Sequence, residues 1–318
     1  MNVSFIVPTR PTDFKNDIVK KQFGEIDAGG HHIEIFLVEG FHPPLQRNAA
    51  IRKSEGDFVF FFDDDALIPA DLISKTLSYF DNDKVAGVGG PNLTPDNDSP
   101  FAKLCGELLS SFFATGSASM RWKRGKSNYD ATEKELHGSF ICFRGDIIRK
   151  HLFSEDLFPG DENELINRIR KVGYRFYYLP DCFVYHKRRK NLVAYLKQIF
   201  ISGRGRAEQT KKEGLKGNLY YVIPLLFSIY LLWAPIVYRH HPFWLFPFII
   251  YSALAIFFSL RIVLARRTLF YSLLIPLFLI SHVTYACGFV RGLFLQKKRE
   301  RRYLEEDVAL HRYVFNSL

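Results

Sequence analysis

Three consecutive carboxylates, Asp63, Asp64 and Asp65, follow an uninterrupted run of apolar residues. If this run is a strand, the first and third carboxylates point to one face of it and the middle one to the other. Like charges this close repel one another strongly unless a cation lies among them. Oxygen ligands suit Mg²⁺ or Mn²⁺, and either ion can also bind a diphosphate. The run therefore predicts a cation site, with a solvated acidic turn as the alternative.

A second pair of acids, Asp161 and Glu162, begins a predicted helix that continues to Val172 and stops at Gly173. Acidic side chains at a helix N-terminus interact favourably with the helix dipole, so the pair can serve as a cap. Capping is the simplest role for these residues, and it is compatible with a role in catalysis.

The elements that must position these acids alternate between strands and helices from residue 1 to about 186. Short apolar runs predict strands at Val3–Pro8, His32–Val38 and Asp57–Asp63, with helical patterns between them. This order predicts an α/β domain with a mostly parallel sheet, whose continuous apolar strands are covered by helices on both faces. Ligands of such sheets lie beyond the carboxyl ends of the strands. We therefore expect the site directly after these three strands.

Three uncharged runs follow, at residues 219–238, 243–260 and 269–290. Each is close to the ~20 residues that a helix needs to cross a bilayer, so the runs predict a C-terminal transmembrane region. The alternative is three buried helices of a large soluble core.

The first apolar run, Val3–Pro8, is too short for a secretory signal, so the N-terminal domain is expected in the cytoplasm, at the cell membrane. Three crossings would then place the basic residues after the third run outside, against the positive-inside rule. Two crossings and one re-entrant or interfacial segment would keep both ends inside. We favour two crossings with one re-entrant or interfacial segment, and the number stays open between two and three.

The charge is distributed unevenly over the 318 residues. The 43 Lys and Arg residues exceed the 33 Asp and Glu residues, which gives a net charge of +10, yet residues 1–182 carry −5. The positive excess lies in residues 183–218, at +8, and in residues 219–318, at +7. These segments adjoin the apolar runs and lack the interleaved aromatic residues of a nucleic-acid platform. The charge therefore indicates a lipid bilayer as the partner, and no nucleic acid.

The acidic run resembles the DxD motif of GT-A glycosyltransferases, specifically the inverting enzymes of family 2. Other stretches resemble the same family in the expected order, and together they cover residues 1 to about 190. They are the opening strand at 3–10, the second strand at 36–40, the stretch before the DxD strand at 46–57, the acceptor-side strand at 137–144 and the E-D-x-E-L-type helix start at 158–168. The resemblance implies a nucleotide-diphospho-sugar transferase fold and a sugar-transfer reaction.

The resemblance also implies which residues bind the donor. Asp63 and Asp65 would hold the Mn²⁺ or Mg²⁺ that bridges the donor diphosphate, and His186 would either complete the coordination or be structural. Glu39 stands where the family usually has Asp, so the nucleotide stays open, with UDP-sugars favoured. The implied donor-binding set is Pro8, Thr9, Arg10, Glu39, Arg47, Asp63, Asp64, Arg204 and Arg206.

On the acceptor side, the resemblance implies one carboxylate that takes the proton of the attacking hydroxyl. The family has Glu-Asp with Asp as the base, whereas this chain has the reversed pair. Position favours Glu162 and residue type favours Asp161; we expect Glu162. Arg204 and Arg206 lie in a Gly-Arg-Gly-Arg run that either clamps a donor or lipid diphosphate or belongs to a basic helix on anionic headgroups. The residues expected near the acceptor are His137, Gly138 and Gln198.

These observations together predict an inverting, metal-dependent glycosyltransferase in the cell membrane, with its catalytic domain facing the cytoplasm. It would move a sugar from a nucleotide-diphosphate donor to a membrane-borne, polyprenyl-diphosphate-linked acceptor in envelope or exopolysaccharide glycan synthesis. The alternative is a catalytically degenerate scaffold subunit of a membrane glycan-assembly complex. The expected domains are a catalytic domain at 1–190, a basic juxtamembrane segment at 191–218, transmembrane helices at 219–290 and a basic tail at 291–318.

Overall fold

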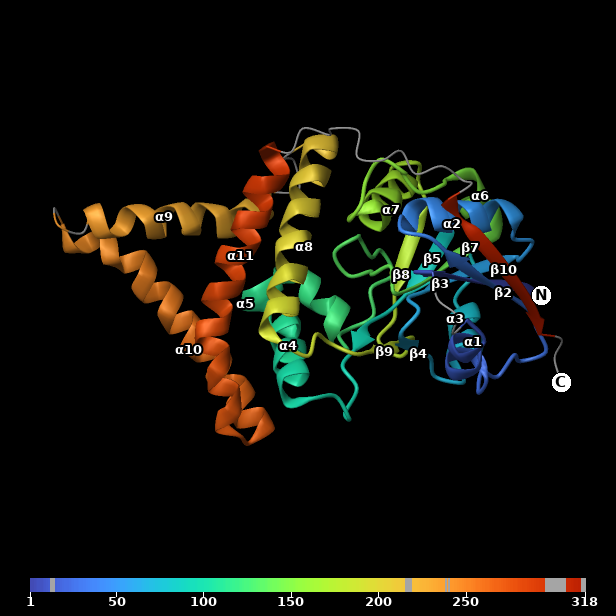
Figure 1. Ribbon diagram of the computed structural model, residues 1–318, viewed down its shortest axis with the longest axis horizontal. Coiled ribbons are helices and arrows are strands. Elements are labelled where there is room, and N and C mark those ends of the chain that lie inside the picture. The colour runs from blue at the N-terminus through green and yellow to red at the C-terminus, as the bar shows by residue number, and fades with distance from the viewer. Residues whose placement is uncertain (12–14, 215–218, 238, 240, 295–306, 316–318) are drawn as a thin grey trace. The chain divides into compact units, whose positions relative to one another are not determined.

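The computed structural model describes the chain except residues 12–14, 215–218, 238, 240, 295–306 and 316–318 (Figure 1). The chain forms two compact units. The first unit, called the catalytic unit here because most of the expected site residues lie in it, contains residues 1–96, 120–187 and 299–318, and the helical unit contains residues 97–119 and 188–298. Residues 97–119, which the sequence analysis assigned to the catalytic domain, thus belong to the helical unit.

A seven-stranded sheet forms the centre of the catalytic unit, in the order β10-β2-β1-β3-β7-β5-β8. The strands β1, β2 and β3 are parallel to one another, as are β5 and β8, whereas β7 and β10 are antiparallel to their neighbours. The α/β fold agrees with the sequence analysis, although the sheet is mixed rather than mostly parallel. The strand bounds are β1 Asn2–Thr9, β2 His32–Glu39, β3 Phe58–Phe62, β5 Val85–Gly89, β7 Phe140–Arg144, β8 Arg175–Tyr178 and β10 Ala309–Phe315.

Helices cover both faces of this sheet. On β3, the side chains of Phe58, Phe60 and Phe62 pack into one core, whereas those of Val59 and Phe61 pack into the other. This arrangement explains why the strand is apolar at every position. Helices α1 (Lys15–Phe23) and α3 (Leu72–Leu77) contribute to the first core, and α2 (Pro43–Lys53), α6 (Gly145–Lys150) and α7 (Asp161–Lys171) contribute to the second.

Beyond the end of β3, a small second sheet has the order β4-β9-β6. Its strands are β4 (Ala66–Leu67), β9 (Val184–His186) and β6 (Asn92–Leu93). The 3₁₀ helix η1 (Gly116–Trp122) leads into the loop before β7.

The last strand of the sheet, β10, comes from the C-terminal end of the chain. Seven of its residues pair with β2, from Ala309 opposite Glu39 to Phe315 opposite Ile33. The sequence analysis gave residues 291–318 as a basic tail and did not predict this strand. The tail prediction was therefore wrong for residues 309–315, because the charges that precede them masked a short β-rich run.

The helical unit contains α4 (Pro100–Ser110), α5 (Phe112–Thr115), α8 (Leu192–Glu213), α9 (Ile223–Val237), α10 (Phe246–Arg266) and α11 (Leu274–Phe294). The 3₁₀ helices η2 (Leu219–Val222), η3 (Pro242–Leu245) and η4 (Leu269–Leu273) precede the last three. Three segments are long and apolar enough to cross a membrane: Leu219–Ile236, Pro242–Arg266 and Leu269–Phe294. The first two are 11% buried, so protein does not cover their apolar surface, whereas the third is 44% buried.

Candidate active site

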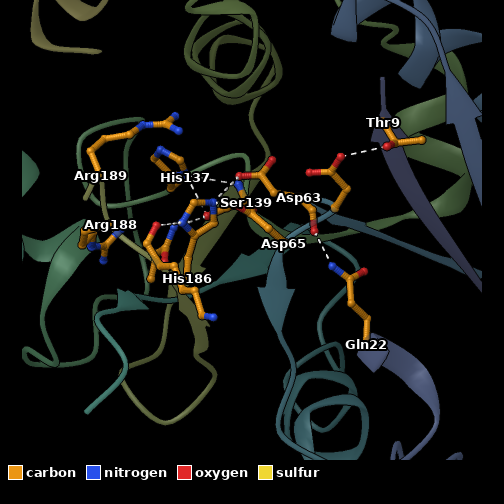
Figure 2. Close-up of polar contacts among 12 residues, drawn as sticks. Thr9, Gln22, Asp63, Asp65, His137, Ser139, His186, Arg188 and Arg189 are labelled. Carbon is orange, nitrogen blue, oxygen red and sulfur yellow. Dashed lines mark hydrogen bonds and ion pairs between the residues drawn. The ribbon is translucent and has the colours of Figure 1, made fainter. Parts of the chain in front are cut away.

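The acidic run follows β3 directly, and strand pairing brings His186 to it. Because β4 and β9 are antiparallel with Ala66 opposite His186, the imidazole lies beside the acids. Its Nε2 is 2.8 Å from Asp65 Oδ1 and 3.5 Å from Asp63 Oδ2 (Figure 2). The ligand atoms of these three residues lie within 4.8 Å of one another, so they form a group that could hold a metal ion.

The electrostatics of this group favour a bound cation. Burial acts to raise the pKa of Asp63, but the hydrogen bond and charge of His186 outweigh it and lower the pKa to about 2. Burial acts to lower the pKa of His186, but the two carboxylates raise it to about 10. The Nδ1 of His186 lies 2.9 Å from the carbonyl oxygen of Lys187, which fixes the ring and directs Nε2 at the acids. Two oxygens and one nitrogen fit Mn²⁺ or Mg²⁺, which would replace the shared proton.

The middle acid, Asp64, lies apart from this group, as the strand alternation predicts. Its Oδ2 accepts a hydrogen bond of 2.8 Å from Thr9 Oγ1, at the end of β1. Burial and the neighbouring charges of Asp65 and Asp63 raise the pKa of Asp64, while the Thr9 hydroxyl opposes them. Gln22 of α1 donates to the backbone oxygen of Asp63 at 3.0 Å. These bonds fasten the acidic turn to the neighbouring strand and helix.

The expected nucleotide-binding residues lie at the ends of β1 and β2. Glu39 is paired with Thr9 across the two parallel strands. Lys15 Nζ is 3.0 Å from Glu39 Oε1, and His311 of β10 is 3.8 Å from its other oxygen. Gln46 donates to the carbonyl oxygens of both strand ends, at Thr9 and Val38. Lys15 and His311 carry no motif signal that sequence reasoning can use.

Pro8 lies in β1 and is half-buried, and Arg10, directly after the strand, is exposed. The backbone oxygen of Arg10 accepts a hydrogen bond of 3.2 Å from Thr9 Oγ1.

A second cluster surrounds the start of α7. Arg47, from α2, places Nη1 2.7 Å from Asp161 Oδ2 in a buried ion pair, with 8% of the arginine side chain and none of the aspartate side chain exposed. Gly160 precedes the helix with φ of 111°, a conformation that favours glycine. Glu162 is partly exposed. Burial acts to raise the pKa of Glu162, but the Arg47 guanidinium outweighs it and holds the pKa below its ordinary value. Glu162 is therefore ionised and accessible, whereas Asp161 is enclosed.

The loop before β7 lies against this cluster. A Cβ added at Gly138 would lie 3.3 Å from Arg47 Nη2 and 3.5 Å from the carboxyl carbon of Glu162. The Nδ1 of its neighbour His137 lies 3.1 Å from the backbone nitrogen of Ser139 and 2.8 Å from the Oγ of the same residue. Burial and the charge of Arg121 lower the pKa of His137 to about 4, which keeps the imidazole neutral.

The two clusters are electrostatically linked, because the charge of Arg47 lowers the pKa of Asp63 as well as that of Glu162. Arg121, which the sequence analysis did not single out, donates to Asn163 Oδ1 at 2.6 Å and so braces the first turn of α7. The catalytic unit thus holds all the expected site residues except three: Gln198, Arg204 and Arg206.

These three residues lie on α8 of the helical unit. Arg189 donates to Gln198 at 3.2 Å, and Arg204 Nε lies 3.5 Å from Glu208. Arg206 is buried, donates to Gln209 Oε1 at 2.8 Å and stacks on Tyr221 at 4.3 Å. Its guanidinium therefore has a role in packing the helical unit, and its expected donor contact stays a prediction.

Comparison with known proteins identifies the family. The profile of the family described as "Glycosyltransferase like family 2" matches residues 36–203, more than half of the chain. The chain belongs to glycosyltransferase family 2. It is a glycosyltransferase, and its α/β unit has the GT-A fold.

A curated relative from Methanococcus voltae is 23% identical over 290 residues, which cover 89% of this chain and 85% of the relative. It is named dolichyl N-acetyl-alpha-D-glucosaminyl phosphate 3-beta-D-2,3-diacetamido-2,3-dideoxy-beta-D-glucuronosyltransferase. Among solved structures, the mannosyltransferase PcManGT from Pyrobaculum calidifontis, in complex with GDP-Man and Mn²⁺, is 16% identical with a TM-score of 0.53. That match covers 92% of this chain and 87% of the mannosyltransferase. TarS 1–349 of S. aureus, in complex with UDP-GlcNAc, is 13% identical with a TM-score of 0.44 and covers 93% of each chain.

Proposed function

We propose that this family 2 glycosyltransferase is an inverting, metal-dependent enzyme. It transfers a sugar from a nucleoside-diphosphate donor, expected to be a UDP-sugar, to an acceptor carried by a polyprenyl lipid. The observation that carries this proposal is the meeting of two groups in one unit: the Asp63, Asp65 and His186 ligand set, and the ionised Glu162 next to Arg47.

Asp63, Asp65 and His186 hold the metal. A bound divalent cation would neutralise the donor diphosphate and stabilise the charge that develops as the nucleoside diphosphate departs. Thr9 and Gln22 hold the acidic turn in place through the bonds at Asp64 and Asp63. The metal in the Pyrobaculum calidifontis mannosyltransferase complex supports this part of the proposal.

Glu162 acts as the catalytic base that takes the proton from the acceptor hydroxyl as its oxygen attacks the anomeric carbon. Displacement in a single step inverts the configuration at that carbon. Asp161 is a positioning residue, because its ion pair with Arg47 fixes the first turn of α7 and leaves no exposed carboxylate. His137, as a neutral imidazole beside Gly138, is placed to hold an acceptor oxygen.

The polyprenyl-linked acceptor is supported by the three apolar helices and by the dolichyl phosphate in the name of the Methanococcus voltae relative. A substrate in the bilayer needs an enzyme that is held there, whereas a water-soluble acceptor does not.

The test uses the purified full-length protein in detergent with Mn²⁺ and a panel of nucleoside-diphosphate sugars. Each donor is offered a polyprenyl-linked sugar and the same sugar without its lipid, and the anomeric configuration of the product is read by NMR. We expect an inverted product with the lipid-linked acceptor and none after chelation of the metal. A retained configuration or a chelator-resistant reaction would contradict the proposed mechanism, and equal transfer to the free sugar would contradict the acceptor. If no donor in the panel supported either transfer or hydrolysis, this result would favour the degenerate scaffold.

A further inference from the structure

Strand β10 fixes how many times the chain can cross a membrane. It follows the three apolar segments in the sequence, yet it pairs with β2 in the sheet that β1 opens. Both ends of the described chain therefore lie on the same side of any bilayer. Because each crossing changes the side, the number of crossings between residues 188 and 298 must be even. At least one of the three apolar segments therefore does not cross.

An ion pair shows on which side α10 ends. Residues 97–119 leave the catalytic unit after Asp96 and rejoin it at Met120. Two crossings would need about 40 residues, so this insertion stays on the side of the catalytic unit. Glu107, on α4 of the insertion, accepts a hydrogen bond of 2.7 Å from Arg266 Nε, at the end of α10. The junction between α10 and α11 therefore also lies on that side.

Helix α11 then starts and ends on the side of the catalytic unit. It lies alongside α8, as Figure 1 shows, with Tyr195 hydrogen bonded to Ser281 at 3.0 Å and Lys211 donating to the carbonyl oxygen of Gly292 at 2.8 Å. Between these contacts the backbones of α8 and α11 approach so closely that a Cβ at Gly203 would clash with the backbone of Tyr285. Helix α8 has seven charged residues among 22, so it cannot lie in the hydrocarbon core along its length.

Helices α9 and α10 remain as the crossing pair. They form a V in Figure 1, and Arg239 lies in the sequence between the end of α9 at Val237 and the start of η3 at Pro242. Their apolar segments of 18 and 25 residues reach about 27 and 37 Å as helices, close to the ~30 Å hydrocarbon core. Arg239 is the one Lys or Arg in residues 219–260, whereas Arg261, Arg266 and Arg267 precede α11. Basic residues thus gather at the ends that adjoin the catalytic side, as the positive-inside rule requires for a cytoplasmic domain.

We propose that the chain crosses the bilayer twice, away from the catalytic unit through α9 and back through α10, and that α11 lies with α8 on the catalytic side as an interfacial helix. This topology does not depend on the sugar that is transferred. It removes the conflict between three apolar segments and a basic C-terminal region that three crossings would place outside.

Single cysteines test this topology in sealed vesicles of both orientations. A Cys287→Ser chain serves as the background, because Cys105, Cys142 and Cys182 are buried. Arg239→Cys, Thr268→Cys and Val314→Cys report on the V, on the α10–α11 junction and on β10. Val172→Cys marks the side of the catalytic unit, since Val172 is 60% exposed. Each variant is labelled with a membrane-impermeant maleimide, and an unchanged melting midpoint with Mn²⁺ confirms its folding.

We expect Thr268→Cys and Val314→Cys to be labelled in the same vesicles as Val172→Cys, and Arg239→Cys in vesicles of the opposite orientation. Labelling of Val314→Cys opposite to Val172→Cys would establish an odd number of crossings and overturn the proposal. Labelling of Thr268→Cys on the far side would make α11 a crossing helix. Labelling of Arg239→Cys on the near side would show that the V does not cross.

Discussion

Replacing Glu162 by Gln removes one carboxylate and keeps the size of the side chain. We expect the variant to bind a nucleoside diphosphate with Mn²⁺ as tightly as the native chain does. Transfer should slow by about 10²–10⁴-fold, the usual contribution of a positioned general base. This factor corresponds to about 3–5 kcal/mol of activation free energy. The effect is expected on the rate because the Glu162 carboxylate lies beside Gly138, which is expected near the acceptor, while other residues are expected to bind the metal.

Replacing Asp161 by Asn is the matched perturbation one residue away. It leaves the buried Arg47 without the carboxylate that lies 2.7 Å from it. Glu162 still faces Arg47, so the loss is that of one buried hydrogen bond to a charged group, about 1.5–3 kcal/mol. For a protein of this size, each kcal/mol lowers the melting midpoint by roughly 2–4 °C, so the midpoint should fall by roughly 3–12 °C. The partly exposed Glu162→Gln change should shift it by less than about 2 °C.

The assay measures three quantities for both variants: initial rate of transfer with Mn²⁺, affinity for the nucleoside diphosphate, and melting midpoint. The expected pattern is a slow but stable Glu162→Gln chain and a destabilised Asp161→Asn chain. If Glu162→Gln transferred sugar at the native rate while Asp161→Asn lost transfer with an unchanged midpoint, Asp161 would be the base and the reasoning from burial would be refuted.

Three further predictions concern the metal group and the acceptor loop. Replacing His186 by Ala should weaken Mn²⁺ binding at least ~10-fold by calorimetry, with donor binding reduced in parallel; unchanged affinity would remove this residue from the ligand set. Because the pKa of His186 is about 10 without metal, its proton competes with Mn²⁺ and the apparent affinity should rise roughly tenfold per pH unit between about pH 7 and 9. An affinity that is flat over this range would contradict the proton exchange. Gly138→Ala places a Cβ 3.3 Å from Arg47 and 3.5 Å from Glu162, so transfer should fall roughly tenfold at an unchanged melting midpoint. Native transfer in this variant would show that the loop has room to move.

The stability of the metal-free protein should depend on pH through the protonation of His186. Its folded pKa is raised above the ordinary value of 6.5, so the ion pairs with Asp63 and Asp65 stabilise the metal-free protein fully below about pH 6.5. This stabilisation is lost as the pH rises towards 10. In metal-free protein His186→Ala should therefore lower the melting midpoint at pH 6 and have little effect near pH 10, whereas a loss that does not vary with pH would point to packing instead.

The sequence by itself determined the chemistry at the strand ends. An apolar run followed by three acids predicts a buried strand that ends at the acids, because a strand covered on both faces has no room for charged side chains along its length. Local pattern and family resemblance identified the candidate site acids: the three after β3, Glu39 and the Asp161–Glu162 pair. Local pattern also identified the apolar segments. Position in the motif favoured Glu162 as the base and residue type favoured Asp161, so the local pattern left both residues as candidates.

Only the tertiary structure decided which of these residues act together. The pairing of β4 with β9 brings His186 next to acids about 120 residues earlier in the chain. Arg47 of α2 forms a buried ion pair with Asp161, so Asp161 and not Glu162 is the enclosed acid of the pair. The pairing of β10 with β2, on which the proposed even number of crossings rests, could not be predicted from a basic C-terminal region. Local sequence specifies how a segment folds and how apolar it is. Contacts between distant segments depend on how the whole chain packs, and these contacts set pKa values and burial.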